Sequence, residues 1–230
     1  MENGDFKPEA VIFDMDGLML DTERTTIPLW TEAGKIFGYN IMPGTVMRMI
    51  GLSSENSRIL LQDEFGADFP YDELRAQFRR LVNKLFDETG IPLKSGVVFL
   101  LDRLAQLKIP LAVATSTRRA RAVECLEKTN ILKFFKIIVG GDDVANGKPE
   151  PDIFLLAAQM LGVSPSACAG FEDSPAGLKG LHAAGIRSVF IKDMIEPAQD
   201  VLATVWRRYG NLTEAAEIFN LIVGTSKNLG

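Results

Sequence analysis

The chain has 230 residues, of which 47% are hydrophobic, so it can bury a substantial core and is not expected to be disordered. Its net charge of -5 gives no basic surface for nucleic acid, and its apolar runs are too short to span a bilayer. The polar, acidic start lacks the apolar segment of a signal peptide. We expect a cytoplasmic monomer without a nucleic-acid or membrane partner.

The first expected element is a short buried strand, Val11 to Phe13, which ends in two aspartates, Asp14 and Asp16, followed by Gly17. If the strand continued, both carboxylates would point to one face; if Gly17 turns the chain, Asp16 swings round toward Asp14. In either case two acids share a small volume, which is costly unless a cation or a shared proton relieves it. The pattern therefore indicates a reaction centre.

A calcium-binding EF-hand loop is excluded at this position. Such a loop needs glycine at its sixth position and glutamate at its twelfth. Counted from Asp14, Gly17 is only the fourth residue.

The remainder of the chain divides into a helical block followed by alternating strands and helices. In the block we expect helices at 23–37, 46–50, 55–65 and 71–88. From Gly96 onward we expect helices at 97–107, 118–128, 152–161 and 176–184, and strands at 111–115, 136–139, 167–171 and 188–191.

This alternation predicts an α/β fold with a Rossmann-like parallel sheet core. The Val11 strand needs parallel partners, so the helical block must be an insertion between the first and second strands of that sheet. We expect the α/β core at residues 1–19 and 95–230 and an inserted all-helical domain at residues 20–94. The two crossings, near Leu20 and near Leu93, would form the hinge.

In an open parallel sheet, ligands bind beyond the carboxyl ends of the strands. The residues expected at that rim are acids, hydroxyls and one lysine: Asp14, Asp16, Thr115, Ser116, Thr117, Lys148, Glu172 and Asp173. Their convergence at one rim is a stronger signal than any single motif.

The rim predicts a metal and phosphate site. Asp14, Asp16 and Asp173 supply the hard oxygen ligands that Mg²⁺ takes, and this ion also binds substrate phosphate. Lys148 adds a fixed positive charge, and we expect Glu172 to hold metal-bound waters or Lys148.

The Thr115 hydroxyl and the amides that follow it, expected at a helix start, favour an anion. A Walker-type phosphate loop does not fit around Lys148, because Asp142 stands where its first glycine is required and Pro149 replaces the Ser or Thr.

A carboxylate nucleophile beside a phosphate site suggests phosphoryl transfer through an aspartyl-phosphate. Asp14 would attack phosphorus while ionised. Asp16 would first donate a proton to the leaving oxygen and then act as base for the incoming water, so the two acids need different environments.

Four segments, FDMDGLMLDTE, VATST, GKPEPDIF and GFEDSPAG, resemble in this order the signature motifs of the haloacid dehalogenase superfamily of aspartyl phosphotransferases. The likeness runs from about Ala10 to Ile191. The helical insertion resembles the cap domain of the subgroup that includes β-phosphoglucomutase and many small sugar phosphatases.

The resemblance implies a role for each rim residue. Asp14 would be the nucleophile, and Asp16 the acid and base that also lends its main-chain carbonyl to the metal. Asp173 would complete the Mg²⁺ site. The remaining residues would bind or steady the phosphate: Thr115, the Ser116 amide and Lys148.

Within the family, the residues favour a phosphatase over the alternative, a β-phosphoglucomutase-like phosphomutase. In the mutase an arginine follows a Gly-x-Ser loop of the cap, whereas here Ser54 follows Gly51-Leu52-Ser53; the mutase also has a histidine where Thr26 stands. The neighbours Arg79 and Arg80 could replace the missing cation, but adjacent helix residues of this kind are more often solvated.

We therefore predict a Mg²⁺-dependent phosphatase acting on a small phosphorylated metabolite, either a sugar or a nucleoside monophosphate. A non-catalytic phosphorylatable switch, as in receiver domains, ranks last because those domains are near half this length and lack the helical insertion.

Overall fold

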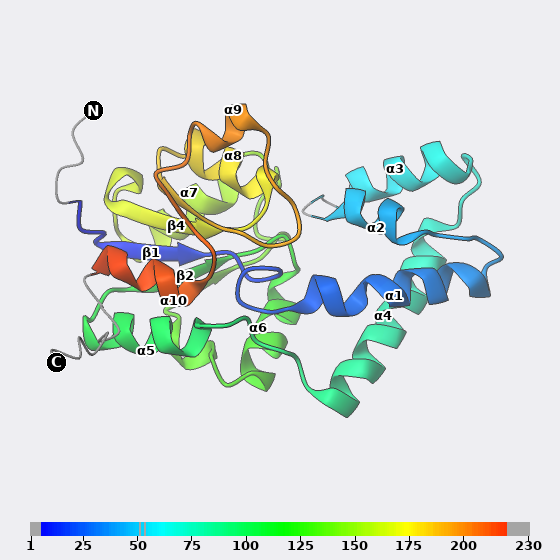
Figure 1. Ribbon diagram of the computed structural model, residues 1–230, viewed down its shortest axis with the longest axis horizontal. Coiled ribbons are helices and arrows are strands. Elements are labelled where there is room, and N and C mark those ends of the chain that lie inside the picture. The colour runs from blue at the N-terminus through cyan, green and yellow to red at the C-terminus, as the bar shows by residue number, and fades with distance from the viewer. Residues whose placement is uncertain (1–5, 51, 53, 220–230) are drawn as a thin grey trace, which may run out of the picture.

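The computed structural model describes residues 6–50, 52 and 54–219. Its centre is a six-stranded parallel sheet in the order β3-β2-β1-β4-β5-β6 (Figure 1). The strands are Ala10–Phe13 (β1), Leu111–Ala114 (β2), Ile137–Val139 (β3), Cys168–Glu172 (β4), Arg187–Ile191 (β5) and Arg207–Tyr209 (β6). The predicted α/β, Rossmann-like fold class is confirmed, and β6 is a strand that the sequence pattern did not indicate.

The central strand β1 is buried on both faces of the sheet. Ala10 and Ile12 pack into one apolar cluster, and Val11 and Phe13 pack into another. Helices α7 (Asp152–Leu161) and α8 (Pro175–Ala183) cover the first face. The second face is covered by α5 (Val97–Gln106), α6 (Arg119–Lys128) and α10 (Leu212–Ala215). This two-sided burial explains the unbroken apolar run of β1.

The strand order places the switch point of the sheet between β1 and β4. From β1 the chain goes to β2 and β3 on one side, then returns to β4 on the other. Phe13 is in register with Val113 of β2 and with Phe171 of β4, and the Asp14 amide donates to the Phe171 carbonyl at 3.0 Å. Asp14 therefore leaves the sheet level with Glu172, where such folds bind ligands.

A block of helices separates β1 from β2, and the β1 arrow points toward it in Figure 1. It consists of α1 (Thr22–Ile36), α2 (Pro43–Met49), α3 (Ser54–Phe65) and α4 (Tyr71–Thr89), with no strand between Thr22 and Thr89 among the described residues. The block has an apolar cluster of its own, and Trp30 stacks on Phe78 within it. We call this block the helical insertion.

The two connections to the helical insertion run side by side. Leu20 and Leu93 form an antiparallel bridge, and the Asp21 amide donates to the Pro92 carbonyl at 2.9 Å. The Lys94 amide donates to the Met19 carbonyl at 2.9 Å. The division into a core of residues 1–19 and 95–230 and a domain of residues 20–94 stays a prediction.

The C-terminal part of the fold differs most from the expected elements. α9 (Gln199–Leu202), β6 and α10 are each four residues long or shorter. Segments of this length show too few turns or alternations for a periodic pattern. Among the described residues, no helix is long and apolar enough to cross a membrane.

Candidate active site

A buried lysine lies at the switch point of the sheet. The Lys148 side chain is 3% exposed, its Nζ contacts Asp14 Oδ1, and it donates to Glu172 Oε1 at 2.6 Å. The same nitrogen lies 4.9 Å from the ring centre of Phe154 in α7. Burial alone would lower the pKa of Lys148, but the charges of Asp14 and Glu172 raise it above its ordinary value. Lys148 is therefore a fixed cation beside Asp14.

Glu172, the last residue of β4, is fully buried and held by several donors. Its Oε2 accepts the amides of Asp173 and Ser174, both at 2.8 Å, and the Ser174 hydroxyl at 3.0 Å. Ser174 caps α8 by accepting the Gly177 amide at 3.0 Å. These contacts fix Glu172, which holds Lys148 with its other oxygen.

Three carboxyl groups beyond the end of β1 have raised pKa values: those of Asp14, Asp173 and Glu23. Burial raises the pKa of Asp14 to about 8 against the opposing charge of Lys148. Burial, together with the charges of Glu172 and Asp14, raises the pKa of Asp173 well above its usual range. Burial and the charge of Asp16 raise the pKa of Glu23 to about 9. Each of these three carboxyl groups is therefore harder to ionise than a free one.

Asp16 lies between the core and the helical insertion. One carboxylate oxygen accepts the hydroxyl of Thr22, the first residue of α1, at 2.8 Å. The other accepts the hydroxyl of Thr117, in the loop after β2, also at 2.8 Å. Thr117 was expected at the rim without a role, and the contact with Thr22 was not expected.

The loop after β2 holds Thr115 and Ser116. Thr115 is 1% exposed, and its hydroxyl oxygen accepts the Thr117 amide at 3.1 Å. We expected the following amides at a helix start, but this expectation was wrong for Ser116. Arg118, with φ -57° and ψ 139°, is still extended, so α6 begins only at Arg119. The exposed Ser116 therefore precedes the helix by three positions.

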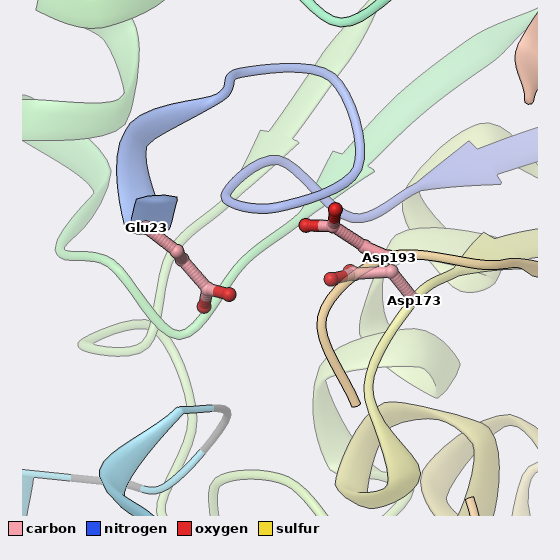
Figure 2. A group of neighbouring side chains, drawn as sticks. All are labelled: Glu23, Asp173 and Asp193. Carbon is pink, nitrogen blue, oxygen red and sulfur yellow. The ribbon is translucent and has the colours of Figure 1, made fainter. Parts of the chain in front are cut away.

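The donor set for a divalent cation fits this site. Carboxylate oxygens of Glu23, Asp173 and Asp193 lie within 4.8 Å of one another, and Figure 2 shows the three side chains facing a common region. One oxygen of each (Oε2 of Glu23, Oδ1 of Asp173 and Oδ2 of Asp193) is buried without a hydrogen-bond partner in the described part of the chain. Hard, unpaired oxygens of this kind are suited to Mg²⁺.

Gly17 makes room for these carboxylates. Its φ of +86° favours glycine, and a Cβ there would lie 2.3 Å from Asp173 Oδ2 and 3.2 Å from Glu23 Oε2. The turn after β1 can therefore approach the acids only without a side chain.

Of the three aspartates expected to bind metal, only Asp173 belongs to this closest group of acids; Asp14 faces Lys148, and the Asp16 carboxylate faces two hydroxyls. Neither Glu23 nor Asp193 was among the residues expected at the rim. Asp193 follows β5 by two residues. The rule that ligands bind beyond the carboxyl ends of the strands, applied to this strand as well, would have identified it.

Comparisons with known proteins agree with this geometry. The profile of the haloacid dehalogenase-like hydrolase family matches residues 11–191. A phosphorylated carbohydrates phosphatase of Thermotoga maritima is 29% identical over 93% of this chain and 98% of its own length. The β-phosphoglucomutase of Bacillus subtilis is 33% identical over 79% of this chain and 82% of its own.

Among solved structures, CbbY from Rhodobacter sphaeroides in complex with phosphate is similar, with a TM-score of 0.76 and 25% identity. The match covers 90% of this chain and 96% of that one. The chain belongs to the haloacid dehalogenase-like hydrolase family, as its four motifs indicated, and is an enzyme of that hydrolase class.

The packing around Glu172 gives a stability prediction. A Cβ at Gly177 would lie 1.7 Å from Glu172 Oε1, whereas a Cβ at Gly44, also in the first turn of a helix, meets nothing within 4 Å. Gly177→Ala should lower the free energy of unfolding by roughly 1–3 kcal/mol, the usual cost of overpacking. The matched control Gly44→Ala should raise it by roughly 0.5–1 kcal/mol. Urea denaturation measures both, and equal effects would contradict the prediction.

Proposed function

We propose that this chain is a Mg²⁺-dependent phosphatase that hydrolyses a small phosphorylated metabolite, a sugar or nucleoside monophosphate, through an aspartyl-phosphate on Asp14. The observation that carries the proposal is the buried contact of Lys148 with Asp14 beside unpaired carboxylates at the switch point of the sheet. The similarity to a phosphatase of phosphorylated carbohydrates supports the substrate class.

In the first step, a carboxylate oxygen of Asp14 attacks phosphorus and the bond from phosphorus to the leaving oxygen breaks. Lys148 holds the other oxygen of Asp14 and keeps the nucleophile oriented. Asp16, in its protonated form, gives its proton to the leaving oxygen, which departs as a neutral hydroxyl.

In the second step, water attacks the phosphorus of the aspartyl-phosphate while Asp16 takes the proton of that water. The bond from phosphorus to Asp14 breaks, and inorganic phosphate leaves. Thr115 and the Ser116 amide would bind the phosphate oxygens, and Lys148 would steady them.

Asp14, the Asp16 carbonyl and Asp173 would hold Mg²⁺. When bound, this ion supplies positive charge that keeps the carboxylates ionised and offsets the charge of the phosphate. Without that charge, burial raises the pKa values of Asp14 and Asp173, so neither acid is well prepared to act as an anion at neutral pH.

The helical insertion would act as a cap that covers the leaving group and excludes water. Thr22 supports this role, because it donates from the first residue of α1 to Asp16. A rearrangement of the insertion would therefore change the surroundings of the proposed acid and base.

A phosphomutase is the second candidate, favoured by the similarity to β-phosphoglucomutase. Against it, the Thr26 hydroxyl donates within its own helix to the Glu23 carbonyl at 3.3 Å, and Arg79 and Arg80 are exposed. The expected Gly51-Leu52-Ser53 loop includes positions 51 and 53, which lie outside the described residues.

One feature favours the mutase. Burial lowers the pKa of half-buried Arg75 of α4, and the charges of Arg79 and, more weakly, of Arg118 in the core act in the same direction. Two such arginines, one from each side, are suited to a second phosphate.

The first prediction from this mechanism concerns the nucleophile. Asp14→Asn should abolish release of phosphate from a panel of phosphorylated metabolites assayed with Mg²⁺, because the amide is not a nucleophile toward phosphorus. The matched control is Asp102→Asn, which changes an exposed acid of α5 and should keep wild-type turnover. Wild-type turnover of Asp14→Asn would reject the mechanism.

Asp16, as the proposed proton donor, should matter most for substrates with a poor leaving group. With p-nitrophenyl phosphate, whose leaving group needs no proton, Asp16→Asn should release nitrophenolate in a stoichiometric burst and then stall, because no base activates water. With a sugar phosphate the same variant should be slower than the wild type by roughly 10²–10⁴-fold in the first step. Equal slowing of the burst on both substrates would contradict an acid role for Asp16.

The products formed from a hexose 1-phosphate distinguish the phosphatase from the phosphomutase. Incubation of the wild type with a hexose 1-phosphate and Mg²⁺ should release free phosphate, measured colorimetrically, with no isomerised sugar phosphate by NMR. Formation of the hexose 6-phosphate without free phosphate would replace the phosphatase with the mutase.

A further inference from the structure

The two carboxylate oxygens of Asp193 differ in their partners. Oδ1 pairs with Lys94 Nζ at 2.7 Å and with Arg24 Nη2 at 3.1 Å. Lys94 also pairs with Asp21 at 3.1 Å. Lys94 and Asp21 lie on the two connections to the helical insertion, and Arg24 lies in the first turn of α1. This oxygen therefore ties the core loop after β5 to the base of the insertion.

The second oxygen of Asp193 has no such partner. The side chain is only 6% exposed, and Oδ2 is buried without a hydrogen-bond partner within the described residues. Asp193 forms a group with Glu23 and Asp173, each of which also has an unpartnered, buried oxygen. Figure 2 shows the three side chains. Within the described residues, Lys94 and Arg24 pair with Asp193 through Oδ1, so they give no partner to the three unpaired oxygens.

The group draws on both parts of the molecule. Glu23 lies in the first turn of α1, in the helical insertion, whereas Asp173 and Asp193 follow β4 and β5 of the core. A ligand that bound all three would connect the insertion to the core.

A divalent cation is the ligand whose chemistry suits three such carboxylates. Mg²⁺ binds oxygen at about 2.0–2.1 Å, so two of its ligands lie at most about 4.2 Å apart. The three carboxylates offer oxygens within 4.8 Å of one another. Gly17, Lys94 and Asp193 also line a cavity of about 180 Å³.

We propose that Glu23 and Asp193 are further acids of the divalent-cation site at Asp173, so that the bound cation fastens the start of the helical insertion to the core. This inference rests on the metal site of the proposed function. The insertion would then have two attachments to the core. One is the set of ion pairs through Lys94, and the other would form only when the cation is bound.

Isothermal titration of MgCl₂ into the full chain, without substrate, tests the assignment. Glu23→Gln and Asp193→Asn should each weaken Mg²⁺ binding by roughly 10–100-fold, as loss of supporting acids does elsewhere, and Asp173→Asn should abolish it. The controls Glu32→Gln, exposed on α1, and Asp200→Asn, exposed in α9, should bind like the wild type.

Lys94→Gln separates a metal role of Asp193 from a hinge role. It removes the ion pair but no acid, so it should leave Mg²⁺ affinity unchanged or increase it. If Lys94→Gln weakened binding as much as Asp193→Asn does, Asp193 would act through the hinge, and the inference would be wrong.

Hydrogen exchange gives a readout independent of affinity and of turnover. Saturating Mg²⁺ should slow amide exchange at residues 17–24 and 90–95 in the wild type but not in Glu23→Gln. Equal slowing in both proteins would overturn the proposed attachment.

The Mg²⁺ affinities of the variants and of the wild type also distinguish failure of this inference from failure of the proposed function. Wild-type affinity in both Glu23→Gln and Asp193→Asn, with binding lost in Asp173→Asn, would refute only the inference. A wild type that binds no Mg²⁺ yet releases phosphate would refute the metal site of the proposed function and the inference together.

Discussion

The burial of Lys148 between Asp14 and Glu172 is the interaction on which the rest of the site depends. Removing ions from water costs on the order of several kcal/mol for each ion, so the surroundings must compensate every charge. For Glu172 they do so with two amides, one hydroxyl and the lysine. The close approach of α8 that this requires is possible only because residue 177 is glycine.

The charges on the other side of Asp14 are not compensated in this way. Asp173 and Glu23 have buried oxygens without partners and raised pKa values, while the nearest bases of the hinge are engaged by Asp193 and Asp21. The site is thus divided into a balanced half, which orients the proposed nucleophile, and an acidic half, which is stable as a set of anions only beside a cation.

Much of this arrangement could be predicted from the sequence, because a doubly buried strand is a strong pattern and parallel strands end at one edge. That reasoning brought Asp14, Lys148, Glu172 and Asp173 to one site. It could not show that the Glu23 side chain points toward Asp173. That orientation depends on where the turn at Gly17 places the start of α1. The strand Arg207–Tyr209 was missed because Arg-Arg-Tyr has no apolar alternation.

Two of these acids, Asp16 and Asp193, also link the helical insertion to the core. Asp16 is bound by Thr22 of the insertion and Thr117 of the core, and Asp193 is bound by Lys94 and Arg24 at the hinge. Each contact joins the two parts through an acid beside the proposed metal site. Ion pairs at a partly exposed hinge contribute little stability by themselves, so the position of the insertion depends on small free energies. Binding of the proposed cation or phosphate would change the charge among these acids and so shift this balance.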